Sequence, residues 1–341
     1  MPGFRDESDL EEHLSRPTPA DIEAVKTLGG DFMLLGAGGK MGPTLALRIQ
    51  RAINEAGSSQ RVIAVSRFSE DRVRETLINA GIEIYSTDLL DEQALFDLPD
   101  TENLIYLAGR KFGSSDNAGL TWAMNVLLPG RVVDRFRTAR IAALSSGNIY
   151  PLMPVDSKGA NEGSALGPVG EYAQSILGRE RMFEYGAEAY GAKVINLRLN
   201  YALEPRYGVL LDIGLKVFNE EPVDVTMPAV NVIWQGDANS YVLQSLTLAA
   251  SPAATLNIAG PEILRVRDIA TAFAKRFNKP LSITGIEAPT ALLNNGSRAH
   301  QLFGPPLISW QQAFDWTADW ISTGGRFLGK PTHFEARDGK F

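Results

Sequence analysis

Short apolar runs alternate with segments of helical spacing along most of this chain, and this alternation limits the fold more than any other feature. Apolar runs bounded by turn residues are typical of strands that are buried on both faces of a parallel sheet. Because strands that alternate with helices form right-handed βαβ units, we predict an α/β fold with a doubly wound parallel sheet. The predicted strands span residues 32–35, 61–65, 83–85, 103–107, 141–144 and 194–197.

The segments between these strands predict helices, and the whole pattern divides the chain into four parts. The predicted helices span residues 43–56, 71–80, 118–138, which Pro129 is expected to kink, and 172–190. A shorter helix, capped by Thr18 or Asp21, is expected to end after Leu28 at two glycines. The four parts are an appendage at residues 1–30, a sheet domain at 31–199, a smaller lobe at 200–329 and a tail at 330–341.

The lobe and the tail carry further expectations. The lobe is less regular than the sheet domain, and we expect it to close over the carboxyl edge of the sheet and bind substrate, with some segments returning to the sheet. The tail is dense in polar and aromatic residues, so that it either folds over the site or a partner subunit or stays mobile.

Composition excludes several classes of function. A net charge of −7 provides no basic face for nucleic acid or an anionic membrane, and no apolar run approaches the ~20 residues of a membrane span. The absence of cysteine excludes disulfides and thiolate metal sites, and the three histidines are too far apart for a metal motif. Residues 1–12 are too acidic and polar for a signal or transit peptide. We therefore expect a cytoplasmic protein without a metal.

A glycine-rich turn follows the first predicted strand and opens the next helix. Gly36, Gly39 and Gly42 have the spacing G-x-x-G-x-x-G, and Lys40 and Met41 lie inside the motif. A tight turn, close backbone approach and a helix N-terminus with free N–H groups together bind a pyrophosphate. The turn predicts a dinucleotide site in a Rossmann-type domain, where Lys40 either contacts a phosphate or is solvated.

The end of the second predicted strand bears on the choice of coenzyme. An acidic residue there usually binds the ribose 2′-hydroxyl of NAD. Here the strand ends in Ser66 and Arg67. The serine can donate a hydrogen bond to a 2′-phosphate, and the arginine can donate two charge-assisted hydrogen bonds from its guanidinium. We therefore predict NADP, with NAD as the alternative.

Residues 172–180, Tyr-Ala-Gln-Ser-Ile-Leu-Gly-Arg-Glu, resemble the active-site helix of the extended short-chain dehydrogenase/reductase superfamily, the sugar-nucleotide epimerase and dehydratase group. The pattern of that family is Tyr-x-x-x-Lys, and here Ile176 occupies the lysine position. Similar segments continue over about residues 32–320, including Ser-Ser-Gly-Asn-Ile-Tyr at 145–150. The resemblance therefore does not depend on the glycine turn alone.

The resemblance implies roles for individual residues. Tyr172 would be the catalytic acid/base, and Ser146 would hydrogen-bond the reacting carbonyl or hydroxyl. Further implied coenzyme contacts are Asp88, Leu89, Leu107, Ala108, Gly109 and Asn125, the last of which could instead be helix packing. Candidate substrate contacts are Asn148, Asn200 and Arg298, with Arg267 as a further candidate for a phosphate or carboxylate. Gly147 and Asn148 stand where the dehydratase subgroup has Asp-Glu, which argues against dehydration.

The isoleucine at position 176 leaves three interpretations open. Free tyrosine titrates near pH ~10, and the family lysine lowers that value and holds the nicotinamide ribose. A cation from elsewhere could substitute, and Lys111 lies in a suitable loop, whereas Arg179 is two helical turns beyond Tyr172 and is expected to be too distant. Alternatively, the chemistry needs no phenolate, or the protein binds nucleotide without turnover.

Two functions follow as hypotheses. The first is an NADP-dependent oxidoreductase or epimerase that acts on a hydroxyl or carbonyl of a sugar-like small molecule. The second is a redox-sensing or scaffold protein that binds the dinucleotide without catalysis. A homodimer is also expected, because the helices at residues 118–138 and 172–190 commonly pair into a four-helix interface in the family.

Overall fold

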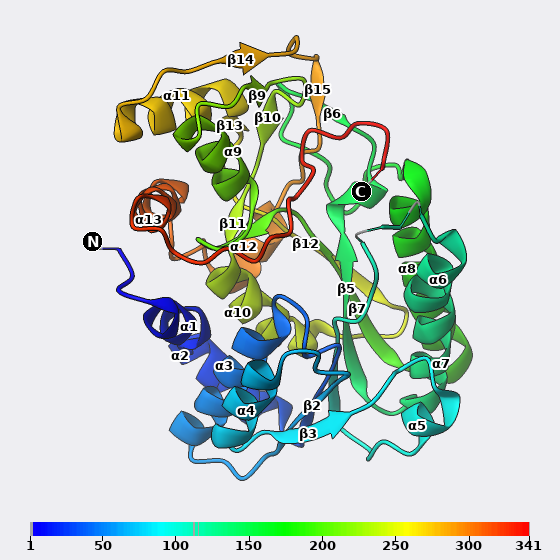
Figure 1. Ribbon diagram of the computed structural model, residues 1–341. Helices are drawn as coiled ribbons and strands as arrows, with labels where there is room; N and C mark the ends of the chain where they lie inside the picture. Colours follow the sequence, from blue (N-terminus) through cyan, green and yellow to red (C-terminus); the bar gives the residue numbers. More distant parts are fainter. Residues whose placement is uncertain (1–2, 112, 115, 341) are drawn as a thin grey trace.

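A seven-stranded parallel sheet forms the centre of the molecule, with strand order β12-β7-β5-β4-β1-β2-β3 (Figure 1). The computed structural model describes residues 3–111, 113–114 and 116–340, so that the ends of the predicted appendage and tail lie outside the described residues. The strands are β1 Phe32–Leu35, β2 Val62–Ser66, β3 Glu83–Ser86, β4 Asn103–Tyr106, β5 Arg140–Ser146, β7 Lys193–Leu199 and β12 Ala254–Ile258. The prediction of a doubly wound α/β fold is confirmed, and β12 is a strand that sequence reasoning did not place.

Helices cover both faces of the sheet because successive side chains of each strand point to opposite faces. From β1, Phe32 and Leu34 pack in a core with helices α2, α3 and α10, whereas Met33 and Leu35 pack in a second core with α7 and α8. The helices are α1 Glu7–Ser15, α2 Pro19–Leu28, α3 Gly42–Ala56, α4 Asp71–Asn79, α5 Glu92–Phe96, α6 Ala118–Trp122, α7 Leu128–Arg135, α8 Gly170–Tyr190, α9 Val209–Phe218, α10 Gln235–Ser245, α11 Val266–Phe277, α12 Ser297–Phe303 and α13 Trp310–Ser322. None of the helices in the described part of the chain has the length and hydrophobicity that crossing a membrane requires.

The predicted helix over residues 118–138 is divided into three pieces. A π-helical turn at Ala123–Leu127 separates α6 from α7, and α7 ends at Arg135. Pro129 lies where the π-helical turn passes directly into α7, and because proline has no N–H group it cannot donate a helical hydrogen bond there. The helix is therefore irregular next to Pro129, in the form of a π-helical turn, and the predicted boundary at residue 138 was three residues too long.

A second layer of structure, formed largely by residues after 200, lies above the carboxyl edge of the sheet (Figure 1). Its helices α9, α11 and α13 enclose a core that includes Phe273, Trp234 and Trp316. Four two-stranded ladders border this core: β8 Ala202–Leu203 with β11 Ile233–Trp234, β9 Val223–Asp224 with β14 Ile283–Thr284, β10 Ala229–Val230 with β13 Leu264–Arg265, and β6 Met153–Pro154 with β15 Thr290–Ala291. Segments α10 and β12 return to the sheet and pack in its core.

The N-terminal residues are integrated into both parts of the molecule. Thr18 and Asp21 form a capping box at the start of α2, as the sequence indicates. Asp21 also pairs with buried Arg48 at 2.7 Å, which ties α2 to α3. The preceding helix α1 was not predicted, and its Leu10 and Leu14 join the core of the second layer.

The C-terminal segment crosses the front of the molecule from α13 toward the start of α8 (red in Figure 1). Thr332 donates to the Asp212 carboxylate through its backbone nitrogen at 2.8 Å and its hydroxyl at 2.5 Å, and Phe334 is buried. Farther along, Arg337 donates to the Thr290 carbonyl at 2.7 Å. Of the two alternatives for the tail, the structure shows the segment packed against the fold.

Candidate active site

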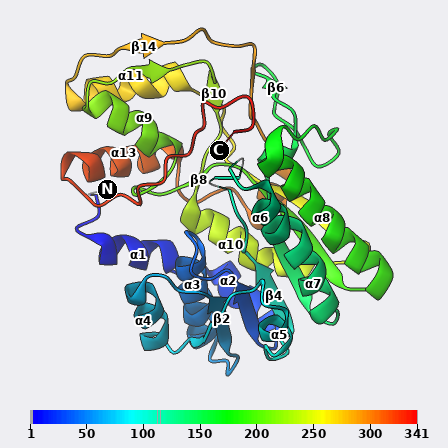
Figure 2. The same cartoon turned by 45° about the vertical axis from the view of Figure 1, so that its right-hand side comes forward.

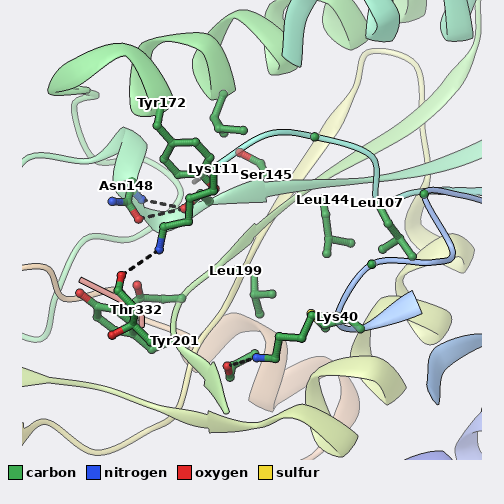
Figure 3. A pocket seen from close by; sticks show the side chains of 18 of the residues that line it. Lys40, Leu107, Lys111, Leu144, Ser145, Asn148, Tyr172, Leu199, Tyr201 and Thr332 are labelled. Carbon is green, nitrogen blue, oxygen red and sulfur yellow. Dashed lines mark hydrogen bonds between the residues drawn. The ribbon is translucent and has the colours of Figure 1, made fainter. Parts of the chain in front are cut away.

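A cavity of about 270 Å³ lies at the carboxyl ends of β1, β4, β5 and β7, between the sheet and the second layer (Figure 3). From β1 the chain builds the sheet outward to β2 and β3, and it then returns to place β4 on the other side of β1. The cavity therefore opens where the strand order reverses, which is the position at which doubly wound sheets bind their ligands.

The glycine turn forms one wall of the cavity and has the geometry of an anion site. Gly36 has a φ of +92°, and a Cβ there would lie 2.6 Å from the backbone nitrogen of Ala108. At Gly42 a Cβ would overlap the Ala37 carbonyl. No described side chain caps the first N–H groups of α3, so that they are available to an anion. The turn therefore fits a pyrophosphate, and the neighbouring Gly39 and Met41 also line the cavity.

Lys40 extends from this turn across the cavity to the opposite wall (Figure 3). Its Nζ donates to the Ala202 carbonyl at 2.7 Å and lies 3.7 Å from the centre of the Tyr207 ring. Burial lowers the pKa of Lys40 to about 7. The side chain is therefore half-buried and bridges the two layers, and is not the solvated lysine of the alternative interpretation.

Ser66 and Arg67 lie at the same edge of the sheet but outside the cavity lining. The Ser66 hydroxyl packs against the glycine turn, 2.7 Å from where a Cβ on Gly38 would stand. The Arg67 side chain is 75% exposed, with its Nη1 3.9 Å from Asp88 Oδ2. Leu89, which follows Asp88, is buried.

The end of β4 continues the wall from the glycine turn. Leu107 and Gly109 line the cavity, while Ala108 is buried beneath Gly36. The wall at this point is formed largely by backbone because Gly109 has no side chain. These three residues are therefore placed where a ligand bound to the glycine turn would extend.

Tyr172 and Ser146 come together in the cavity from α8 and the end of β5. Ser146 Oγ donates to Asn148 Oδ1 at 3.0 Å. Burial raises the pKa of the Tyr172 phenol, while the charge of Arg179 and the neighbouring Ser146 hydroxyl lower it. The three polar side chains form one cluster on the floor of the cavity.

Lys111 enters the cavity from the loop after β4 and meets the C-terminal segment (Figure 3). Its Nζ donates to the Thr332 carbonyl at 3.3 Å and lies 6.0 Å from the centre of the Tyr172 ring. Burial lowers the pKa of Lys111 to about 8, against the opposing effect of the Asp212 carboxylate. The lysine is therefore near Tyr172 but also linked to the tail.

Asn125 lies behind the cavity wall, in the π-helical turn between α6 and α7. Its side chain accepts from the Arg110 backbone nitrogen and donates to the Arg110 carbonyl, both at 2.9 Å. It also donates to Ser175 Oγ at 2.9 Å and accepts from Arg179 Nη2 at 2.9 Å. The π-helical turn thus aims Asn125 at the loop after β4 and at α8.

The candidate substrate residues separate into two groups. Asn148 and Asn200 line the cavity, and Asn200 donates to Asn231 Oδ1 at 2.9 Å. Arg298 is exposed on α12, where it donates to the Thr255 carbonyl at 3.2 Å, and Arg267 pairs with Glu287 at 2.6 Å. Neither arginine lines the cavity.

The cavity residues that were not predicted as site residues include Arg179, Tyr201, Tyr207 and Thr332. Arg179 is seven residues beyond Tyr172 on the same face of α8, about 10 Å along the helix axis, a gap that its long side chain spans in part. Helical spacing placed Arg179 on this face of α8 but too far from Tyr172, whereas the structure has both residues lining one cavity. The other three carry no local signal, because they reach the cavity only through the packing of the second layer.

Comparisons with known proteins give one family and a common fold. The model of the NAD dependent epimerase/dehydratase family matches residues 32–206, and no curated protein matches the chain. A UDP-glucose 4-epimerase of Thermus thermophilus, solved with NAD, superposes with a TM-score of 0.70 at 17% identity. The UDP-glucose 4-epimerase of Thermotoga maritima with UDP-glucose gives 0.71 at 16%, and the UDP-glucuronic acid 4-epimerase of Bacillus cereus with UDP-glucuronic acid and NAD gives 0.69 at 14%. Each match covers 86% of this chain and 99% of the other, and at these identities it shows the fold alone.

Proposed function

Because the chain belongs to the NAD dependent epimerase/dehydratase family, we propose that it is an NADP-dependent oxidoreductase or epimerase acting on a hydroxyl or carbonyl of a sugar nucleotide. The observation that carries the proposal is the meeting of Tyr172 and Ser146 in one cavity beside the glycine turn. Two of the structural neighbours named above were solved with UDP-sugars, which makes this substrate class the first to test.

The residues around the cavity suit a nicotinamide dinucleotide. The glycine turn and the N-terminus of α3 would hold the pyrophosphate, with Lys40 as a further contact. Leu107, Ala108 and Gly109 would border the nicotinamide ribose, and Asn125 would support that wall from behind. When bound, the coenzyme supplies hydride acceptance and donation at carbon.

The chain's own residues would handle the proton. Ser146 would hold the substrate oxygen through its hydroxyl, and the Tyr172 phenol oxygen would accept the proton of a substrate hydroxyl or return it to a carbonyl. Accepting the proton requires ionised Tyr172, which burial opposes. Ile176 offers no charge, so that a cation from elsewhere must favour the ionised form, and Lys111 at 6.0 Å from the ring centre is one candidate.

Elimination of water is less suited to this site than proton and hydride transfer. Dehydration needs an acid and a base beside the tyrosine. The residues that follow Ser146 are Gly147 and Asn148, neither of which exchanges a proton near neutral pH. We therefore favour an oxidoreductase or an epimerase over a dehydratase.

A second candidate function is dinucleotide binding without catalysis, in a redox-sensing or scaffold protein. The observations that favour it are the apolar side chain at position 176 and the link of Lys111 to the Thr332 carbonyl. This candidate predicts coenzyme binding with no conversion of any sugar nucleotide.

The function is tested by titrating the purified protein with NADP⁺ and NAD⁺ and then adding UDP-glucose or UDP-glucuronic acid. We expect tighter binding of NADP⁺, because Arg67 at the end of β2 can pair with its 2′-phosphate. Arg67→Ala should reduce this preference about tenfold, the value of one charge-assisted hydrogen bond. The exposed Arg74→Ala on α4 is the matched control.

The outcomes of this experiment separate the candidates. An epimerised sugar, detected by chromatography, indicates an epimerase, whereas accumulation of reduced coenzyme indicates a dehydrogenase. Coenzyme binding without either product supports the second candidate. If Arg67→Ala leaves the ratio of the two affinities at the control value, the assignment of NADP is wrong.

We also propose that the protein is a homodimer that pairs through α6, α7 and α8, which lie side by side (Figure 2). Along this helical layer Trp122, Leu127 and Tyr185 are exposed, with 39%, 51% and 56% of their surfaces accessible, and Trp122 and Leu127 line one shallow groove with Met182 and Tyr190. Large apolar side chains gathered on one surface are typical of an interface. Light scattering should give twice the chain mass for the intact protein and one chain mass for Leu127→Asp; a monomeric parent protein would contradict the proposal.

A further inference from the structure

Four arginines in the described part of the chain are buried, and Arg179 differs from the other three. Each of the others pairs with a buried carboxylate: Arg48 with Asp21, Arg198 with Glu180, and Arg206 with Glu204. Arg179 is 4% exposed, yet its guanidinium donates to neutral oxygens, the Leu144 carbonyl at 2.7 Å and Asn125 Oδ1 at 2.9 Å. Its Nε is buried without a hydrogen-bond partner among the described residues.

A buried charge that lacks an opposite charge is costly for a fold to keep. The cost is offset where the charge acts on a group that becomes an anion during function. Arg179 lines the same cavity as Tyr172, and its charge acts on the Tyr172 phenol. Arginine also keeps its charge at every pH at which a protein is folded.

We infer that Arg179 supplies, from farther along the same helix, the positive charge that Ile176 lacks, and that this charge favours the ionised form of Tyr172. The inference rests on the proposed function in one respect, which is that ionised Tyr172 accepts a proton from the substrate. Arg179 is thus a positioning residue, which acts on the proton transfer through Tyr172.

The guanidinium of Arg179 is held in place from several sides. Asn125 fixes one end, and is itself held by both backbone groups of Arg110. Gly109 leaves room for the guanidinium, because a Cβ at that residue would overlap Arg179 Nη2. The Tyr106 ring lies 5.2 Å from the guanidinium carbon. A charge that is fixed before the reaction needs no reorganisation when Tyr172 ionises.

Ile176 strengthens the effect of Arg179 although it has no charge of its own. Its side chain is 2% exposed and lines the cavity one helical turn beyond Tyr172 and three residues before Arg179. An apolar side chain at this position excludes water. Because the interaction between two charges grows as the local dielectric constant falls, the more distant arginine acts with less screening.

Other ionisable groups face Tyr172 from the neighbouring elements. Lys111, on the loop after β4, has a pKa that burial lowers to about 8, while the charge of the Asp212 carboxylate acts in the opposite direction. Tyr207, on the loop before α9, interacts with Asp212 and with Tyr172, and burial raises its pKa. Lys111 is therefore a weaker source of positive charge than Arg179 near pH 8, and burial is the effect that opposes ionisation of Tyr172.

The test measures the ionisation of position 172 in the intact protein. A 3,5-difluorotyrosine introduced at position 172 ionises at lower pH than tyrosine, and its ¹⁹F NMR shift reports protonation of that one side chain. Arg179→Met should raise the midpoint of this titration by one pH unit or more, since an opposite charge nearby shifts a pKa by about 1–3 units. Arg181→Met, an exposed arginine on the same helix, is the matched control and should leave the midpoint unchanged.

Two further variants separate charge from structure. Arg179→Gln keeps a hydrogen-bonding side chain without the charge, and should raise the midpoint as Arg179→Met does, even if the methionine variant unfolds. Adding Ile176→Lys to Arg179→Gln returns a cation to the helix and should lower the midpoint again. If the added lysine does not lower the midpoint, the shift arises from a rearranged helix and the inference is overturned.

The inference is also overturned if the midpoint in Arg179→Gln equals that in Arg181→Met, or if Lys111→Met raises the midpoint more than Arg179→Gln does. The titration uses neither coenzyme nor substrate, so that its result does not depend on the proposed function. A protein that turned over no sugar nucleotide could still show the shift, and an active enzyme could lack it.

Discussion

Tyr172→Phe is expected to lower the proposed turnover of a sugar nucleotide by about 10²–10⁴-fold, the usual contribution of a positioned acid or base. The phenol oxygen, in the cavity that Ser146 also lines, is the atom proposed to carry the proton. The ring that fills the site is unchanged in the variant, so that coenzyme binding should be almost unaffected. Single-turnover kinetics and coenzyme titration measure the two effects separately.

Tyr85→Phe provides the control for this prediction. Tyr85 is on β3, where its hydroxyl donates to Glu83 Oε1 at 2.9 Å, away from the cavity. Its variant should match the parent protein in both rate and coenzyme affinity. A Tyr172→Phe protein with the turnover of the control would show that Tyr172 is not the acid/base.

Arg198→Met is expected to lower the free energy of unfolding by about 3–5 kcal/mol, because it leaves the Glu180 carboxylate buried without a counter-charge. The two side chains form a bidentate pair behind the cavity, with Nε–Oε1 at 3.0 Å and Nη2–Oε2 at 2.8 Å. Arg198 also donates to the Tyr150 hydroxyl at 2.7 Å. Denaturation by urea, followed by circular dichroism, measures the loss.

Two comparisons make this prediction specific to the buried pair. Arg198→Met combined with Glu180→Leu removes both charges and should recover much of the lost stability, because no unpaired charge then remains. Arg181→Met breaks the exposed pair with Glu184 on the same helix and should cost at most about 1 kcal/mol. Equal stability of the Arg198→Met and Arg181→Met proteins would contradict the prediction.

Local patterns in the sequence predicted most of the elements of the sheet domain. Apolar runs, glycine turns and caps act over a few residues, so that they can be read without the rest of the fold. The capping box of Thr18 and Asp21 and the turn at Gly36 are examples, and all six predicted strands are present. The π-helical turn at Ala123–Leu127 was missed because it has no such local pattern.

The sequence by itself determined the α/β fold and the glycine turn, because short-range periodicity and spacing specify them, and its resemblance to the dehydrogenase/reductase superfamily implied the pair of Tyr172 and Ser146. Only the tertiary structure decided what surrounds that pair. The bond from Lys111 to Thr332 joins residues 221 positions apart, and it forms only when the tail packs over the cavity. Likewise, the direction of the Arg179 side chain depends on Asn125 and Leu144, which other elements bring to α8.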